Sequence, residues 1–143
     1  MGAPLVHTLR VRYAECDAQG VVFNAHYLAY FDVSITELWR AAFGSYQVML
    51  DRGVDIVVAE AQLRFRAPAR FDEELALEVA ISRLGNTSIL SDHLIRHDGQ
   101  TVVEGSLRHV LVDRDTLAKA EIPAWAREGL APWTVATGDP AVR

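Results

Sequence analysis

The sequence predicts an α+β protein in which one long helix is wrapped by a curved antiparallel sheet of about five strands. Three observations support this prediction. One segment, from about Asn24 to the residue before Gly44, carries apolar residues at helical spacing. One strand-like segment precedes it, and four follow it. A single helix cannot cover both faces of a sheet, but one strongly curved sheet can bury it.

The first strand and the helix are predicted from a change of period. In the segment 8–13, Leu9, Val11 and Tyr13 alternate with polar residues, as in a strand. Asn24 is a favoured N-cap residue, and Gly44 is a favoured residue at the helix end. The apolar face of the helix comprises Leu28, Phe31, Ile35, Leu38, Trp39 and Ala42.

The later strands are predicted at 54–67, 74–83, 87–97 and 100–113, with a short turn at 45–50 and a short final helix at 123–130. Asp98 and Gly99 form a dipeptide favoured in type I′ hairpin turns. We expect one domain over residues 1–133 and a frayed tail at 134–143, which has little to pack against. An open sheet edge is commonly covered by a second subunit, so we expect a homodimer or a homotetramer.

Composition narrows the function. The chain has 143 residues, half of them hydrophobic, and a formal net charge of −5. This charge argues against nucleic-acid binding through a basic face. We expect no membrane-spanning segment and no signal peptide, because no long apolar run is present. The single cysteine, Cys16, cannot form an internal disulfide, which favours a cytoplasmic protein.

Three motifs resemble the 4-hydroxybenzoyl-CoA thioesterase family, including its YbgC-type acyl-CoA thioesterases. Residues 10–32 read RVRYAECDAQGVVFNAHYLAYFD, residues 63–75 read LRFRAPARFDEEL, and Thr87-Ser88 begins a strand. The similarity spans roughly residues 7–126. It implies the hotdog fold, in which a strand, a helix and further strands follow in this order. Two residues depart from the family pattern, Gln19 and His26.

The resemblance implies hydrolysis of an acyl-CoA thioester around Asp17 and Asn24. It assigns polarisation of the carbonyl to the backbone N–H at Asn24, where a helix start supplies unpaired donors and partial positive charge. Asp17 would act as nucleophile or as general base on water. Gly20 would let the loop turn closely beneath the substrate. Taken from the residues alone, a solvated loop acid is the favoured interpretation of Asp17, and the resemblance reverses this preference.

The resemblance also implies residues for substrate binding. Phe23, His26, Tyr27 and Asp32 are expected near the acyl group. Asp32 is alternatively a structural acid paired with an arginine such as Arg40, and His26 a surface or interface residue.

Cations are expected along the path of the CoA phosphates, and we favour Ser88 and Arg83 for this contact. Further candidates are Arg64, Arg66 and Arg70. Each of these arginines is alternatively a solvated residue on a strand face or a member of an ion pair.

Other motifs are rejected. Asp113, Asp115 and Thr116 match the first motif of haloacid-dehalogenase-type phosphatases, but too few residues follow for that fold. Cys16 stands beside the proposed catalytic acid without a recognisable cysteine-hydrolase motif, so we interpret it as a packing residue. No metal-binding spacing occurs among the histidines, and no cofactor is expected.

Two rival functions share the predicted fold. One is hydrolysis of an acyl chain from an acyl carrier protein, in which case the partner is a protein. The other is a non-catalytic acyl-CoA-binding module, against which Asp17 argues because pure binding gains nothing from a carboxylate beside a thioester. The acyl group is left open among aromatic, short-chain and branched types.

Overall fold

The computed structural model describes residues 2–135, so positions 136–143 of the predicted tail lie outside the described residues. The elements are β1 (Leu5–Arg10), η1 (Tyr13–Glu15), α1 (Asn24–Phe43), α2 (Tyr46–Asp51), β2 (Val54–Phe65), β3 (Glu74–Leu84), β4 (Ser88–His97), β5 (Gln100–Asp113), α3 (Ala124–Leu130) and η2 (Ala131–Trp133). This order of one strand, one long helix and four strands confirms the predicted layout.

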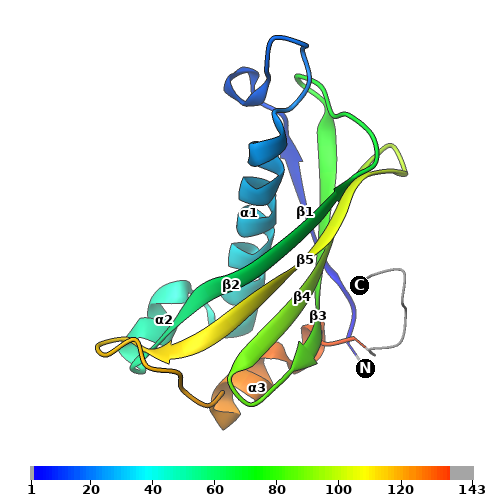
Figure 1. Ribbon diagram of the computed structural model, residues 1–143. Helices are drawn as coiled ribbons and strands as arrows, with labels where there is room; N and C mark the ends of the chain where they lie inside the picture. Colours follow the sequence, from blue (N-terminus) through cyan, green and yellow to red (C-terminus); the bar gives the residue numbers. More distant parts are fainter. Residues whose placement is uncertain (1, 136–143) are drawn as a thin grey trace.

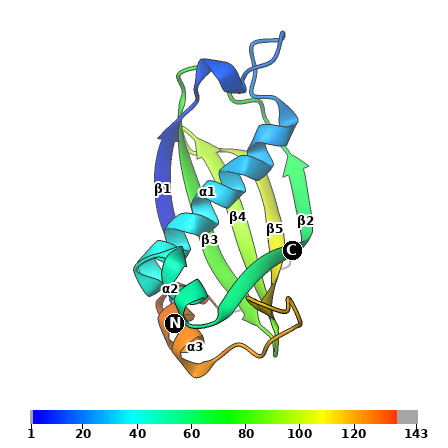
Figure 2. The ribbon, with the colours of Figure 1, turned by 90° about the vertical axis from the view of Figure 1, so that its left-hand side faces the viewer.

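The strands form one antiparallel sheet in the order β1-β3-β4-β5-β2. The sheet curves, and α1 lies across its concave face (Figures 1 and 2). The turn between β4 and β5 is the predicted one, because Asp98 and Gly99 have positive φ angles of 48° and 79°. Such angles are those of a type I′ turn, whose twist matches that of the strands it joins.

The buried face of α1 differs from the prediction in its first turns. Phe31, Ile35, Leu38 and Trp39 are buried as expected, but Leu28 is exposed. Two tyrosines and a serine complete the buried face instead, namely Tyr27, Tyr30 and Ser34. Leu28 lies about 100° around the helix from its buried neighbour Tyr27, which turns it away from the sheet.

Two predicted boundaries were also wrong by a few residues. β1 ends at Arg10, and Tyr13 lies in η1 with 80 % of its surface exposed. The N-cap of α1 is Phe23, whose backbone is extended, and Asn24 is the first helical residue. A propensity scale cannot separate these two positions, because the cap is fixed here by the backbone N–H of Phe23, which donates to the Glu15 carbonyl at 2.9 Å.

The core consists of two apolar clusters along α1. The first surrounds the start of the helix and contains Val11, Val22, Tyr27, Tyr30, Phe31, Ala69, Leu75, Leu77, Ile95, Val102, Val103 and Leu107. The second surrounds its end and contains Ile35, Leu38, Trp39, Val79, Ile81, Ile89, Leu111, Ile122, Ala126 and Leu130. α3 supplies Ala126 and Leu130, so the short final helix closes the second cluster.

Four buried polar residues lie where the two clusters meet, and we call them the polar seam: Ser34, Ser91, His93 and His109. The His93 ring stacks on Phe31 of the first cluster at 4.5 Å, and the His109 ring meets Trp39 of the second edge-on at 5.5 Å. Ser91 Oγ lies 2.8 Å from His93 Nε2.

The two edges of the sheet differ. At one edge, β1 pairs with β3 as far as Val79, and Thr134 then pairs with β3 at Ile81. The Val135 N–H donates to the Ile81 carbonyl at 2.9 Å. At the other edge, β2 pairs with β5 alone within the described residues. Its side chains are largely exposed, including Val57, Val58 and Phe65.

Candidate active site

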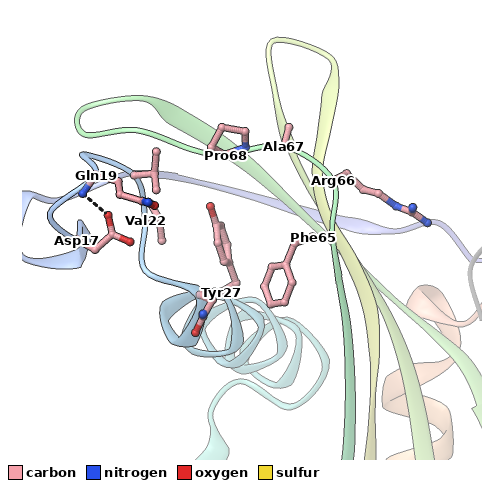
Figure 3. A pocket seen from close by; sticks show the side chains of 10 residues that line it. Asp17, Gln19, Val22, Tyr27, Phe65, Arg66, Ala67 and Pro68 are labelled. Carbon is pink, nitrogen blue, oxygen red and sulfur yellow. Dashed lines mark hydrogen bonds between the residues drawn. The ribbon is translucent and has the colours of Figure 1, made fainter.

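Asp17 stands at the start of a tight loop. Its backbone N–H donates to the Val21 carbonyl and its carbonyl accepts from Gly20 N–H, both at 2.9 Å. The φ angle of Gly20 is +78°, a value that side chains disfavour, so glycine permits this turn. The Gln19 N–H donates to Asp17 Oδ1 at 2.8 Å (Figure 3). Within residues 2–135, the other carboxylate oxygen, Oδ2, makes no hydrogen bond and remains available for chemistry.

The start of α1 offers unpaired donors. Phe23 makes no side-chain cap, and His26 N–H donates back to the Phe23 carbonyl at 2.9 Å. The backbone N–H groups of Asn24 and Ala25 have no acceptor among the described residues, as expected for the first turn of a helix. They and the positive end of the helix dipole favour an anionic oxygen at this point.

A pocket of about 370 Å³ joins the loop to the helix start, and we call it the Tyr27 pocket. Its lining comprises Asp17, Gln19, Val21, Val22, Asn24, Tyr27, Phe65, Arg66, Ala67 and Pro68. Figure 3 shows Asp17 on one side of this space and the rings of Tyr27 and Phe65 facing it, while Arg66 points away. The structure therefore brings together the three predicted residues Asp17, Asn24 and Tyr27.

Tyr27 forms a wall of this pocket. Its hydroxyl accepts from the Ala69 N–H at 3.2 Å, and its ring contacts the Phe65 ring at 5.8 Å. Burial raises the pKa of the Tyr27 phenol above its usual value. The side chain is thus a neutral, fixed surface rather than a proton carrier near neutral pH.

A second pocket, of about 510 Å³, also has Asp17 in its lining, and we call it the Tyr13 pocket. It is lined by Tyr13, Cys16, Asp17, Ala18, Gly20 and Phe71. The rings of Tyr13 and Phe71 meet edge to face at 5.9 Å. Because Asp17 lines both pockets, a substrate with two arms can lie across its carboxylate.

The other expected substrate contacts lie close to the helix start or further along it. Phe23 is about half exposed, and its ring meets the His26 ring at 6.3 Å. Asp32 is eight residues beyond Asn24, about 12 Å along the helix axis. Arg40 pairs with Glu37 and not with Asp32, so the alternative pairing considered for Asp32 is not seen.

Asp32 lines a third pocket of about 290 Å³, which we call the Asp32 pocket. The remaining lining residues are Thr36, Trp39, Tyr46, Ile56, Val58 and His109. Burial lowers the pKa of His109 to about 4, so its ring is neutral near pH 7. The pocket therefore presents one carboxylate, neutral polar groups and apolar strand residues.

The expected CoA contacts are split between the two ends of the sheet. Arg64, Arg66 and Arg70 lie on β2 or just after it, near the loop of Asp17. Ser88 and Arg83 lie at the turn between β3 and β4, next to α3 at the opposite end (Figure 1). Arg83 is nine residues along β3 from Glu74, about 30 Å at the usual rise per residue. Within one chain, Ser88 and Arg83 are not part of the Asp17 site.

Sequence reasoning missed Glu15 and Tyr30, which fasten the Asp17 loop to the helix. The Tyr30 hydroxyl donates to Glu15 Oε1 at 2.9 Å in the interior. Two signals were present in the sequence. Arg12 and Glu15 have capping-box spacing, and Tyr30 has helical spacing from Tyr27 on the buried face.

Two other kinds of site are absent from the part of the chain that the structure describes. Within the described residues, no three or more histidine, cysteine or acidic side chains are grouped so that they could hold a metal ion. No helix in that part of the chain is long and apolar enough to span a membrane. Asp113 accepts from the N–H groups of Asp115 and Thr116 at 2.9 Å, which makes the rejected phosphatase motif a turn after β5.

Comparison with known proteins identifies the family. The profile of the thioesterase-like superfamily matches residues 11–130. The acyl-CoA thioester hydrolase YbgC of Escherichia coli O6:H1 is 30% identical over 106 residues, which cover 73% of this chain and 79% of that protein. The chain therefore belongs to the thioesterase-like superfamily, as the three sequence motifs indicated.

Solved structures agree on the fold. The hypothetical protein TT1821 from Thermus thermophilus matches with a TM-score of 0.84 at 29% identity, covering 93% of this chain and 99% of that one. A 1,4-dihydroxy-2-naphthoyl-CoA thioesterase from Synechocystis matches with a TM-score of 0.82 at 19% identity, covering 90% and 96%. The predicted hotdog fold is confirmed, and the protein is a hotdog-fold member of a family of thioester hydrolases.

Proposed function

We propose that this protein hydrolyses acyl-CoA thioesters to CoA and a carboxylic acid. One observation carries the proposal: Asp17 and Asn24, the first residue of α1, line the same pocket. The name of the YbgC relative, an acyl-CoA thioester hydrolase, supports the substrate class.

In the proposed reaction, the thioester carbonyl oxygen lies at the N–H groups of Asn24 and Ala25. Negative charge that develops on this oxygen is stabilised by these donors and by the helix dipole. Two routes then use Asp17. As a nucleophile, its carboxylate attacks the carbonyl carbon, the CoA thiolate leaves, and water hydrolyses the resulting anhydride. As a general base, it takes a proton from the attacking water and returns it to the leaving thiolate.

A screen across a panel of acyl-CoAs, with detection of the released thiol, tests the reaction. Wild-type protein should release CoA from at least one acyl class, and Asp17→Asn should not. A single turnover in ¹⁸O-labelled water then tests the anhydride route. If water attacks the Asp17 carbonyl of the anhydride, the product carries an unlabelled Asp17 oxygen and the label stays on Asp17. The general-base route instead labels the product and leaves Asp17 unlabelled. Because attack of water on the acyl carbonyl of the anhydride gives that same result, trapping of the anhydride with hydroxylamine completes the test.

Phe23, Tyr27, His26 and Asp32 are proposed to contact the acyl group. Tyr27 forms the wall beside the carbonyl, while Phe23 and His26 flank the helix start. Asp32, about 12 Å further along the helix, is proposed to accept a hydrogen bond from the far end of a hydroxylated acyl group. The Asp32 pocket supports this assignment because it places neutral polar groups beside the carboxylate.

A homo-oligomer, either a dimer or a tetramer, is proposed from the exposed edge of β2. A 12-residue edge strand with exposed valines and a phenylalanine is a template for pairing with a second copy. Val58→Lys should weaken this pairing and lower the mass measured by light scattering. Val6→Lys, which alters a similarly exposed valine on β1, is the matched control and should leave the mass unchanged.

The oligomer bears on CoA binding. Arg64, Arg66 and Arg70 are proposed to meet the phosphates within the subunit that supplies Asp17. Ser88 and Arg83 are far from Asp17 in their own chain, so they contribute only if a neighbouring subunit brings them to the site. Arg83→Ala and Arg70→Ala should each raise KM for acyl-CoA, and an unchanged KM in Arg83→Ala would remove that neighbouring contact.

The carrier of the acyl chain is tested separately. The exposed Tyr13–Phe71 ring pair at the rim of the Tyr13 pocket is a surface on which a carrier protein could dock. An acyl-carrier-protein thioesterase would show a higher kcat/KM with the protein-bound acyl chain than with the CoA ester. The reducing cytoplasm is the proposed location, since Cys16 has no cysteine partner.

A further inference from the structure

Glu15 is a buried acid two residues before Asp17. Only 9 % of the surface of its side chain is exposed. It nevertheless has a full set of donors. Oε1 accepts from the Arg12 backbone N–H at 2.8 Å and from the Tyr30 hydroxyl at 2.9 Å, and Oε2 accepts from the Arg12 guanidinium at 3.0 Å. A buried carboxylate satisfied in this way is held in one place.

The charge state of Glu15 follows from two opposing effects. Burial alone would raise the pKa of the carboxyl, but the hydrogen bonds from Arg12 and Tyr30 outweigh it and leave the pKa below the usual value. The Tyr30 phenol has its pKa raised, first by burial and then by the hydrogen bond to Glu15. Near neutral pH, Glu15 is therefore an anion and Tyr30 a neutral donor.

The contacts of Glu15 reach α1 at two places. Its side chain meets Tyr30 in the second turn of the helix, and its backbone carbonyl accepts from Phe23 N–H, directly before the helix. The next residue, Cys16, pairs with Val22, and Asp17 N–H then bonds to the Val21 carbonyl. Glu15 thus lies between the helix and the loop that carries Asp17.

Arg12 is the weaker of the two side-chain partners. Its side chain is 80 % exposed, so its guanidinium exchanges this contact for water at little cost. Tyr30 is 2 % exposed, and its hydrogen bond to Glu15 is buried. The interior hydrogen bond from Tyr30 is therefore the one that fixes the position of Glu15.

We propose that the hydrogen bond between Tyr30 and Glu15 positions Asp17 against the N–H groups at the start of α1. Neither residue touches the substrate, and both act through the loop, as positioning residues. The inference rests on the proposed function for its kinetic consequence. Its structural consequence, an ordered loop from Glu15 to Phe23, holds whatever the substrate.

The test compares Tyr30→Phe with wild type well below the melting temperature of either. The substitution removes one oxygen and keeps the ring in the core. Because small displacements of a reacting group are costly, kcat should fall roughly 10- to 100-fold with KM changed less than about threefold. Amide hydrogen exchange should become faster at Phe23 and Asp17, whose N–H groups close the loop. Glu15→Gln, whose amide oxygen still accepts from Tyr30, should recover much of the kcat that Glu15→Ala loses.

Ser82→Ala is the matched control for a purely structural role. Its hydroxyl is buried and donates to the Leu90 carbonyl at 3.2 Å, at the opposite end of β3 from Asp17. It should lower the melting temperature without changing kcat or the exchange of the loop amides. The inference is overturned if folded Tyr30→Phe keeps the wild-type kcat, or if Ser82→Ala loses as much kcat as Tyr30→Phe.

Failure of the proposed function gives a different result. In that case wild-type protein releases no thiol from any acyl-CoA. Hydrogen exchange then decides the positioning role alone: faster exchange at Phe23 and Asp17 in Tyr30→Phe supports it, and unchanged exchange overturns it. If Tyr30→Phe does not fold, Glu15→Gln and Glu15→Ala are compared by the same two measurements.

Discussion

The two halves of α1 lie in cores of different composition. Around the first half, the core includes the tyrosines Tyr27 and Tyr30, and loops supply several of its residues, such as Val22 and Ala69. Around the second half, the core consists of aliphatic residues and Trp39. All of these residues lie on β3, β4, β5, α3 or α1, except Ile122, which lies in the loop before α3. The hydroxyl groups of the two tyrosines bond to loop residues at one end, whereas no core ring at the other end does so within the described residues.

This difference separates chemistry from stability along a single helix. The Asp17 loop needs polar anchors because its own backbone is irregular and must be bonded. The second cluster is built mostly from regular strands and helices, which satisfy their own backbone, and Arg127 donates to the carbonyls of the loop residues Gly85 and Ile122. Substitutions in the two halves should therefore affect different measurements.

The largest effect is expected for Asp17→Asn. Loss of a nucleophile or general base should lower turnover at least roughly a hundredfold. The melting temperature should stay close to wild type, because Asp17 is a loop residue at the edge of two pockets. Thiol release on the best acyl-CoA and a melting curve measure both. Near-normal turnover in the variant would exclude Asp17 from the mechanism.

The opposite behaviour is expected for Leu38→Ala in the second cluster. Leu38 is fully buried, and its truncation should cost about 2–5 kcal/mol of stability. Its position is fourteen residues beyond Asn24, about 21 Å along the helix, so kcat of the folded protein should change less than about twofold. Urea unfolding and kinetics check this, with the exposed Gln47→Ala as control. A hundredfold loss of kcat in folded Leu38→Ala would mean that the two halves are coupled.

The polar seam should make stability depend on pH. Burial lowers the pKa of His93 to about 3, aided by nearby His109, and that of His109 to about 4. Both groups bind a proton more readily in the unfolded chain, where the pKa is about 6.5. Their contribution to stability is complete above that value and is lost as the pH falls toward 4, by up to about 1.4 kcal/mol per pH unit for each histidine.

Unfolding free energies between pH 7 and pH 4 test this dependence. His93→Gln should reduce the slope of the unfolding free energy against pH by up to the equivalent of one bound proton, about 1.4 kcal/mol per pH unit. Ser91→Ala removes the neighbour at 2.8 Å without removing a titrating group, so it should lower stability and keep the slope. An unchanged slope in His93→Gln would show that His93 does not carry the dependence.

The smallest and most selective effect is expected for Asp32→Ala. Loss of a charged hydrogen-bond acceptor should reduce kcat/KM about tenfold for a hydroxylated aryl-CoA such as 4-hydroxybenzoyl-CoA. A short aliphatic acyl-CoA should be affected much less. Equal losses on both substrates, together with a lower melting temperature, would leave Asp32 as a structural acid.

Much of the fold follows from periodicity. The strands after residue 53, the turn at Asp98–Gly99 and the four buried residues from Phe31 to Trp39 were predictable because alternation and helical spacing extend over many residues there. The local geometry of the region from Tyr13 to Leu28 was not predictable from periodicity. Its geometry is set by single hydrogen bonds, such as that of Phe23 N–H to the Glu15 carbonyl, which leave no periodic trace.

The candidate site was likewise predictable where its residues are close in the sequence, and not where their positions depend on distant parts of the chain. Asp17, Asn24 and Tyr27 were identified through a motif that is local in sequence, and they meet in one pocket. Ser88 and Arg83 lie at the other end of the sheet, since their distance from Asp17 depends on the whole length of β3. Glu15 escaped notice because its burial depends on Tyr30, fifteen residues away.

The placement of Asp17 between two pockets has a consequence for product release. If a thioester lies across the carboxylate, its cleavage leaves the acid in one pocket and the thiol in the other. Neither product has to pass the other on its way to solvent. The geometry thus imposes no order of departure, and a slowly leaving acid need not retain the coenzyme.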